Sequence, residues 1–243
     1  MLSKNKIKLI QQLKQKKYRD KYELFIVEGK KSVQEFLMSD IFELDSLYHT
    51  KQFQPSKKEG ACFEVSEADL KKISFLKTPQ QVVAVFKKNK PFNSHKSDLI
   101  LALDNIQDPG NLGTIIRLCD WFGVYKIVCS LDTVDCYNPK VVQATMGSLN
   151  RVELVYTDLT DYLQKTKKPI YAAIMDGENV YQSALPKNAV LLMGNEANGI
   201  SKENLKLVSH KIAIPRFGDF QQTESLNVAT ATAILLSEFK RNA

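Results

Sequence analysis

Polar and small residues crowd the stretch 104–123, DNIQDPGNLGTIIRLCDWFG, which lies between the apolar runs LILAL and VYKIV. A turn and a helix cap would explain the loop residues Asp108, Pro109, Gly110 and Asn111. The buried stripe of the predicted helix comprises Leu112, Ile115, Ile116, Cys119 and Phe122. Arg117 lies off that stripe, so it either pairs with Asp120 on the surface or turns toward the loop to hold a phosphate or polarise a hydroxyl. The residues alone leave both interpretations open.

A second polar loop, GNEANGIS, follows the apolar run AVLLM. Gly194 ends a predicted strand, and Ser201 is a candidate N-cap for the next helix. An Asn-Gly turn explains most of this loop. It does not explain Glu196, a glutamate almost directly after a buried strand, at the edge of an α/β sheet where ligands bind.

A third loop, IPRFGDFQQTESLNV, follows the run KIAIP and opens the last helix. Pro215 and Gly218 bend the chain, and Thr223 or Ser225 is the predicted cap. An ordinary capping arrangement explains this loop when it is taken alone. Three such loops, each after an apolar run, point more strongly to one ligand site.

Several familiar chemistries lack their residues in this chain. The sequence has no GxGxxG after a predicted strand, no GxxxxGK[ST] and no GxSxG. The three histidines have no metal-ligand spacing, so no metal site is expected. The cysteines form no CxxC pair, and three of them lie in apolar segments, which favours buried free thiols; they are Cys62, Cys119, Cys129 and Cys136.

From residue 99 onward, apolar runs alternate with segments that have helical or turn character. The runs are LILAL, KIVCS, RVELVY, PIYAAIM, AVLLMG and KIAIP. Several are apolar without strict alternation, as in strands buried on both faces. This pattern predicts an α/β fold with a parallel sheet.

The first part of the chain predicts a small mixed α/β domain. Its expected elements are a basic helix over 4–17, a strand LFIVEG closed by Gly29, a helix KKSVQEFLMS, short strands at SLYHT and CFEVS, a helix after the N-cap Ser66, and a strand QQVVAVFK. The polar segment KKNKPFNSHKS then has no periodicity and contains a proline. We therefore expect a domain at 1–90, a linker at 91–97 and a second domain at 98–243.

The net charge of +7 is unevenly distributed. Residues 1–97 carry 20 lysines and arginines against 11 acidic residues, whereas residues 98–243 carry 14 against 16. A basic module beside a nearly neutral one is typical of a nucleic-acid-binding domain attached to a catalytic body. A lysine-rich solubilising surface is the alternative.

No apolar stretch approaches the roughly 20 residues of a membrane span, and the N-terminus lacks the apolar core of a signal peptide, so a cytoplasmic location without membrane partners is expected.

The three loops together resemble the signature motifs of the SpoU (TrmH-type) RNA 2′-O-ribose methyltransferases of the SPOUT superfamily. NIQDPGNLGTIIR is similar to the first motif, MGNEANGIS to the second and IPRFGDFQQTESLNVATATAIL to the third, and NPKVVQATMGSL resembles a segment between them. The resemblance covers about residues 99–241. FIVEGKKSVQEFL resembles the ribosomal-protein-like substrate-binding domain of many members. The second motif departs from the pattern at Ala197, where glycine is common, and the third has a longer gap after Gly218.

The resemblance implies a parallel α/β methyltransferase domain with a trefoil knot, an S-adenosylmethionine cofactor and a homodimer. The cofactor pocket would be lined by Gly194, Ile214 and Leu226, with Met193, Pro215 and Gly218 beside them. The catalytic centre would comprise Arg117, Asn111, Glu196, Ser225 and Asn227. Arginine is a poor base because its pKa exceeds about 12, so Arg117 is expected to bind the RNA while a phosphate or a neighbouring group takes the proton.

The expected activity is therefore transfer of a methyl group from S-adenosylmethionine to a ribose 2′-hydroxyl of RNA. The large basic first part favours ribosomal RNA over tRNA as the partner, because compact tRNA-modifying members lack such a part. The alternative is a non-catalytic RNA-binding or ribosome-assembly protein on the same fold.

Overall fold

The computed structural model describes residues 2–56, 61–88, 97–220 and 225–241. The chain divides into two compact units, the first formed by Met1–Asn93 with Asp135–Asn150 and the second by Ser94–Val134 with Arg151–Ala243. The backbone thus passes between the units three times. Most of the predicted linker lies outside the described residues, so the division at 91–97 stays a prediction.

The second unit contains a six-stranded sheet in the order β10-β8-β9-β5-β6-β7, and every described pairing in it is parallel. The strands are β5 (Leu99–Leu103), β6 (Lys126–Ser130), β7 (Glu153–Thr157), β8 (Ile170–Asn179), β9 (Ala189–Met193) and β10 (His210–Ala213). Each predicted apolar run forms one of these strands. The predicted parallel α/β sheet is confirmed.

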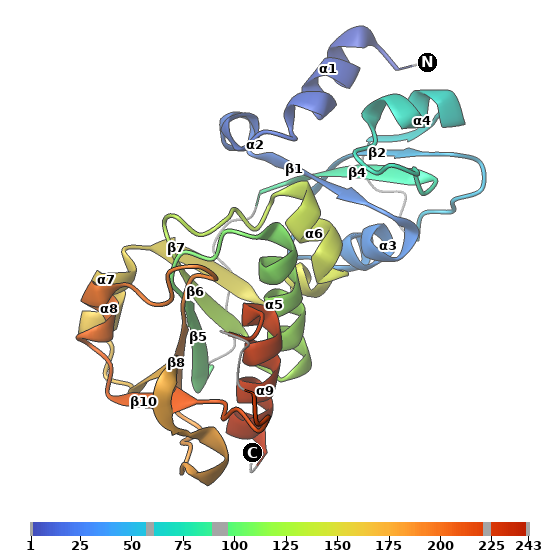
Figure 1. Ribbon diagram of the computed structural model, residues 1–243. Helices are drawn as coiled ribbons and strands as arrows, with labels where there is room; N and C mark the ends of the chain where they lie inside the picture. The colour runs from blue at the N-terminus through green and yellow to red at the C-terminus, as the bar shows by residue number, and fades with distance from the viewer. Residues whose placement is uncertain (1, 57–60, 89–96, 221–224, 242–243) are drawn as a thin grey trace. The chain divides into compact units, whose positions relative to one another are not determined.

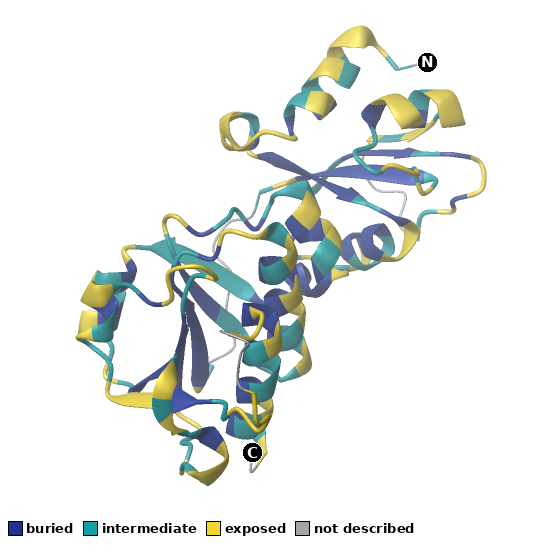
Figure 2. Cartoon of the chain, in the orientation of Figure 1, coloured by how far each residue is buried: buried dark blue, intermediate teal, exposed yellow. Residues whose placement is uncertain are grey.

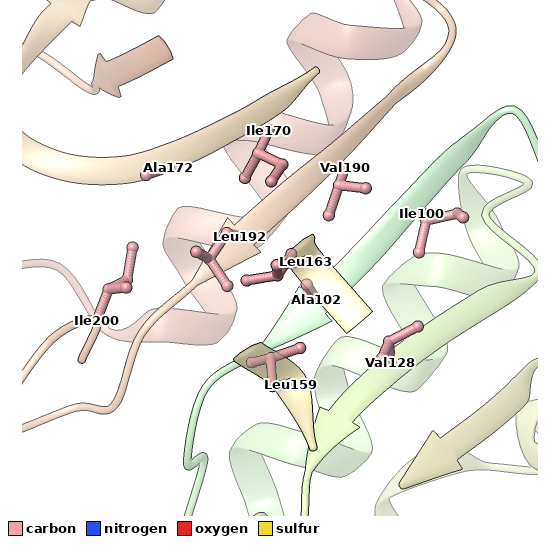
Figure 3. Packing of buried hydrophobic residues seen from close by; sticks show 10 residues of the cluster. All are labelled: Ile100, Ala102, Val128, Leu159, Leu163, Ile170, Ala172, Val190, Leu192 and Ile200. Atoms are coloured by element: carbon pink, nitrogen blue, oxygen red, sulfur yellow. The ribbon is translucent and has the colours of Figure 1, made fainter. Parts of the chain in front are cut away.

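Helices cover both faces of this sheet (Figure 1). On one face, α9 (Val228–Lys240) packs beside α5 (Pro109–Trp121). The other face carries α7 (Leu159–Lys165) and α8 (Lys202–Leu205). Figure 3 shows side chains of neighbouring strands, including Ile100 and Leu192, gathered with Leu159 and Leu163 of α7. Strands β5 and β9 are buried throughout, because helices exclude water from both sides (Figure 2).

The last helix begins later than the sequence predicted. Its N-cap is Asn227, whose side-chain oxygen accepts hydrogen bonds from the backbone N–H groups of Ala229 (3.0 Å) and Thr230 (3.2 Å). The prediction of Ser225 as the cap is wrong, because the Asn227 side chain already fills that role two residues later. The other predicted cap, Thr223, lies outside the described residues.

The first unit is built on a mixed four-stranded sheet in the order β1-β4-β2-β3. Its strands are β1 (Leu24–Glu28), β2 (Leu44–His49), β3 (Ala61–Glu64) and β4 (Val82–Lys87), and its helices include α1 (Lys4–Gln12), α2 (Lys16–Tyr22), α3 (Lys30–Met38) and α4 (Glu67–Ile73). Successive residues of β1 point to opposite faces. Leu24 and Ile26 pack with α1 and α4, whereas Phe25 contacts Phe36 of α3.

The predicted basic helix over 4–17 is divided into two. Helix α1 ends at Gln12 with Leu13 as its C-cap, and α2 begins at Lys16. The Arg19 side chain stabilises the break, because its Nη1 donates to the carbonyl oxygens of Leu13 and Lys14, each at 2.9 Å. A guanidinium thus satisfies main-chain acceptors that a helix end leaves open.

Residues 135–150, with helix α6 (Pro139–Thr145), belong to the first unit although they lie between β6 and β7 in the chain. The Tyr137 ring packs 4.7 Å from that of Phe25. Asp135 accepts hydrogen bonds from Arg19 at 2.6 Å and 2.9 Å, and the side chains are only 10% and 2% exposed. A buried ion pair therefore fastens this segment to α2.

In the described part of the chain, no helix is long and apolar enough to cross a membrane.

Asp135→Asn should destabilise the protein by about 3 kcal/mol or more, because it leaves the Arg19 charge buried without its partner. Urea unfolding followed by circular dichroism measures the change. The matched control is Asp161→Asn, which breaks the exposed Asp161–Lys165 pair on α7 and should cost less than about 1 kcal/mol. Equal losses in the two variants would contradict the role given to the buried pair.

Candidate active site

A cavity of about 1300 Å³ opens beside the carboxyl ends of β9 and β10. Its walls come from residues within 173–175, 193–200, 212–220 and 225–235. The carboxyl edge is where open α/β sheets bind ligands, so the cavity lies where the loops predicted it. All six predicted cofactor-binding residues line it, namely Met193, Gly194, Ile214, Pro215, Gly218 and Leu226.

The main chain itself forms the wall at Gly194. A Cβ atom there would lie 2.3 Å from the carbonyl carbon of Gly199 and 2.4 Å from the nitrogen of Ile200. Asn195 and Gly199 exchange two backbone hydrogen bonds of 2.9 Å, which close the loop, and Gly199 adopts a φ of 68°. Glycine is therefore required at 194 by space and favoured at 199 by backbone conformation.

A buried carboxylate holds this loop against the central strand. Asp104 follows β5 directly and is 6% exposed. It accepts hydrogen bonds of 2.8 Å from the backbone N–H of Ser201 and from the side-chain amide of Asn204, while its own N–H donates to the Met193 carbonyl at 2.9 Å. The sequence analysis missed Asp104 as a site residue. An acidic residue directly after a wholly apolar strand was the available signal.

A second contact joins the loops after β5 and β9. The Asn195 side-chain amide donates to the Asn105 carbonyl at 2.6 Å, and its oxygen accepts from the N–H groups of Ala197 and Asn198. Asn105 itself has a φ of 60°, in the left-handed region that asparagine tolerates better than most residues. Asn195 is a further positioning residue that the predicted site did not include.

Three predicted catalytic residues, one from each loop, form a hydrogen-bonded chain. Nδ2 of Asn111, in the first turn of α5, donates to Oε1 of Glu196 at 2.8 Å. Oδ1 of Asn111 accepts from Nδ2 of Asn227 at 2.9 Å. The structure thus brings together side chains that are separated by 85 and 116 positions in the sequence.

The N-cap of α9 determines which atoms donate and which accept along these hydrogen bonds. Because Oδ1 of Asn227 accepts from two backbone N–H groups, its Nδ2 is left to donate to Asn111. Asn111 must then present its oxygen to Asn227 and its amide hydrogens to Glu196. Oε1 of Glu196 is therefore the acceptor at the end of the hydrogen-bonded chain.

The other two predicted catalytic residues are placed differently. Ser225 lines the cavity together with Glu196. Arg117 is exposed on α5, and among the described residues it has no hydrogen bond or ion pair. The surface pair with Asp120 that the sequence allowed does not form, because Asp120 binds Arg151 at 2.9 and 3.0 Å.

In the part of the chain that the structure describes, the site contains neither a metal-binding cluster nor a reactive thiol. The described ranges contain no group of three or more histidine, cysteine or acidic residues that could hold a metal ion. The four cysteines form no disulfide, with Cys62 partly exposed and the other three buried. Burial raises the pKa of the Cys119 thiol far above its usual value, which suppresses the reactive thiolate.

Comparisons with protein families settle the classification. A model described as the SpoU rRNA Methylase family matches residues 98–237, and one described as an MRM3-like substrate binding domain matches residues 4–84. The chain belongs to the SpoU rRNA methylase family. It is 32% identical to the 23S rRNA (guanosine(2553)-2′-O)-methyltransferase RlmP of Bacillus subtilis, over 95% of this chain and 94% of that protein.

Solved structures of family members share the fold. A putative RNA methyltransferase of the TrmH family from Porphyromonas gingivalis is 38% identical with a TM-score of 0.91, and the match covers 100% of both chains. An AdoMet-bound rRNA methyltransferase from Sinorhizobium meliloti is 30% identical with a TM-score of 0.86, over 99% of this chain and 96% of that one. The predicted family is confirmed.

Asp104→Asn should loosen the loop after β9, because both hydrogen bonds converge on Oδ2 and a neutral amide oxygen in its place accepts them without the negative charge that strengthens them. The expected loss of stability is about 1.5–3 kcal/mol, with faster hydrogen exchange at the Ser201 amide. Asp108→Asn is the matched control, since asparagine caps α5 as well as aspartate does, so the change should stay below about 0.5 kcal/mol. Unchanged exchange at Ser201 in Asp104→Asn would refute the clamp.

Proposed function

We propose that this chain is an S-adenosylmethionine-dependent RNA methyltransferase that modifies a ribose 2′-hydroxyl of ribosomal RNA. The observation that carries the proposal is the Glu196–Asn111–Asn227 chain, which joins the three motif loops beside the cavity of about 1300 Å³. Membership of the SpoU family supports the same activity.

The cavity residues fit the proposed cofactor. Buried apolar side chains such as Ile212 and Leu235 suit an adenine ring, and the main chain of the loop that begins at Gly194 forms part of the same wall. Glu196 is the only acidic residue among the described cavity-lining residues, and its negative charge complements a sulfonium. The cofactor, when bound, supplies an electrophilic methyl group.

Methyl transfer requires an in-line approach and the removal of one proton. S-adenosylmethionine, when bound, would supply the methyl group to the ribose oxygen, and the 2′-hydroxyl proton would pass to an RNA phosphate or to a neighbouring group. No covalent enzyme intermediate is needed, so positioning and charge stabilisation dominate. Arg117 binds the RNA phosphate and the reacting hydroxyl, while Asn111, Glu196, Ser225 and Asn227 shape the centre.

Ribosomal RNA is the proposed substrate class, with 23S rRNA as the first candidate. The excess of nine positive charges over residues 1–97 supports RNA contact by the first part of the chain. The nearly full-length similarity to RlmP supports 23S rRNA, and its name makes a guanosine the first nucleotide to examine. Such a substrate implies a cytoplasmic protein.

A trefoil knot and a homodimer belong to the same proposal. The chain runs from β10 at one edge of the sheet to α9, which packs on α5 beside the central strands, and this return path is compatible with threading. Trp121 at the end of α5 is 84% exposed in the single protomer, which favours burial against a second copy.

Arg117→Ala should lower methyl transfer by about 100-fold or more, as expected when a group that stabilises developing charge is removed. The assay is label transfer from radiolabelled S-adenosylmethionine to unmodified bacterial ribosomal RNA. Resistance of one position to alkaline hydrolysis identifies the 2′-O-methylated nucleotide. Folding and cofactor binding should remain unchanged, because Arg117 is exposed and lies outside the cavity wall.

Arg151→Ala is the matched control, since Arg151 is an arginine of the same unit whose partner Asp120 lies on the surface. Full activity of Arg117→Ala would remove the role given to this residue. Absence of both methyl transfer and cofactor binding in the wild-type protein would instead favour the non-catalytic RNA-binding alternative.

Replacing Lys14, Lys17 and Lys21 by glutamine should weaken RNA binding and flatten its salt dependence. The three side chains are exposed on or beside α2. For every phosphate that is no longer neutralised, the slope of log K against log salt should fall by about 0.7–0.9. The control replaces Lys165, Lys202 and Lys206 in the second unit, which are also exposed. An equal change of slope in both triple variants would contradict a role specific to the first unit.

A further inference from the structure

Two exposed aromatic side chains stand at the mouth of the cavity. Phe217 is 80% exposed and Phe220 is 88% exposed, yet both line the cavity. The ring of Tyr181, in the short helix η2 (Val180–Gln182), lies 6.3 Å from that of Phe217 at an interplanar angle of 31°. Met175 of β8, itself 61% exposed, extends the apolar surface toward Arg216. Phe217 and Phe220 are called the rim aromatics below.

The fold does not account for the rim aromatics. Neither belongs to the buried core of the second unit, and their exposure forgoes the favourable burial of a phenylalanine side chain. The segment 216–220 has no net charge, because Arg216 and Asp219 cancel. Electrostatic attraction to RNA phosphates therefore does not explain why this segment, with its two phenylalanines, is exposed. An apolar surface exposed at the mouth of a cavity indicates a ligand that binds there.

The position of the rim aromatics indicates whether they contact the cofactor or the RNA. The deep wall of the cavity contains Met193, Ile212 and Leu235, which are 3% exposed or less, and this enclosed part suits the cofactor. The methyl acceptor must approach from the open side, where the rim aromatics lie. The nucleotide that offers its 2′-hydroxyl therefore brings its base, or a neighbouring base, against these rings.

We propose that Phe217 and Phe220 form a stacking surface for an unpaired nucleobase of the RNA substrate at the mouth of the cavity. Aromatic rings bind unstacked bases of RNA through their faces, and an enzyme that acts on one nucleotide of a folded RNA gains position by holding its base outside the stack. This proposal rests on the proposed function of the cavity. The rim aromatics act as positioning residues, since they hold the nucleotide while other groups contact the reacting atoms.

The test uses the full-length protein with Phe217→Leu and Phe220→Leu, which keep apolar bulk and remove the aromatic face. Phe217→Trp and Phe220→Trp are the matched controls, because they keep an aromatic face. The leucine variants should lower kcat/KM for ribosomal RNA about 5- to 100-fold, as expected for loss of one stacked base. The tryptophan variants should stay within about threefold of the wild type, and calorimetry should give cofactor affinities within about twofold in all four.

Each other outcome overturns the proposal. A parallel loss of cofactor affinity in the leucine variants would assign the rings to the adenine of S-adenosylmethionine. A shift from dimer to monomer in light scattering would assign them to a second copy of the chain. Wild-type kcat/KM in the leucine variants would remove the stacking role and leave the proposed function intact. Failure of the wild-type protein to methylate any RNA would remove both.

Discussion

The buried carboxylate of Asp104 constrains the geometry of the whole site. A charge at the end of a central strand must be satisfied by hydrogen bonds, because its desolvation is otherwise strongly unfavourable. The loop after β9 supplies two donors, from Ser201 and Asn204. Its path is thereby fixed, the main chain closes at Gly194 without room for a side chain, and Glu196 is held at the cavity. One buried charge at the end of a strand thus sets where a second carboxylate stands.

Asn227, the N-cap of α9, fixes the position of its own side chain in the site, just as Asp104 fixes the path of the loop after β9. Asn227 uses its oxygen on the first turn of the helix, so only its amide is left to face Asn111. The direction of every hydrogen bond in the chain to Glu196 follows from that requirement. The same Asn227 side chain thus caps the helix with its oxygen and binds Asn111 with its amide, so an ordinary N-cap residue also belongs to a candidate catalytic centre.

The sequence predicted the elements and the loops well because these depend on local patterns. Continuous apolar runs such as LILAL and AVLLM identified the buried parallel strands, and the loops after them identified the cavity wall. The features it missed depend on contacts across the chain. Nothing local indicates that Arg19 binds the carbonyls directly after α1, or that Asp104 must bind a residue about 100 positions away. The cap at Asn227 was missed because Ser225 has equal local preference and only tertiary contacts decide between them.

The same long-range contacts bear on how RNA binding can be studied. Residues 135–150 lie within the stretch matched by the methylase family model, yet they pack in the first unit. A fragment that ends near residue 90 would lack Asp135 and Tyr137, which removes the ion-pair partner of Arg19 and opens the aromatic cluster around Phe25. Weak RNA binding by such a fragment would reflect its lower stability as well as the RNA affinity of its surface. A cut near residue 90 therefore separates Arg19 and Phe25 from the segment that packs against them, so the intact chain is the form in which the RNA contacts of the first unit are best measured.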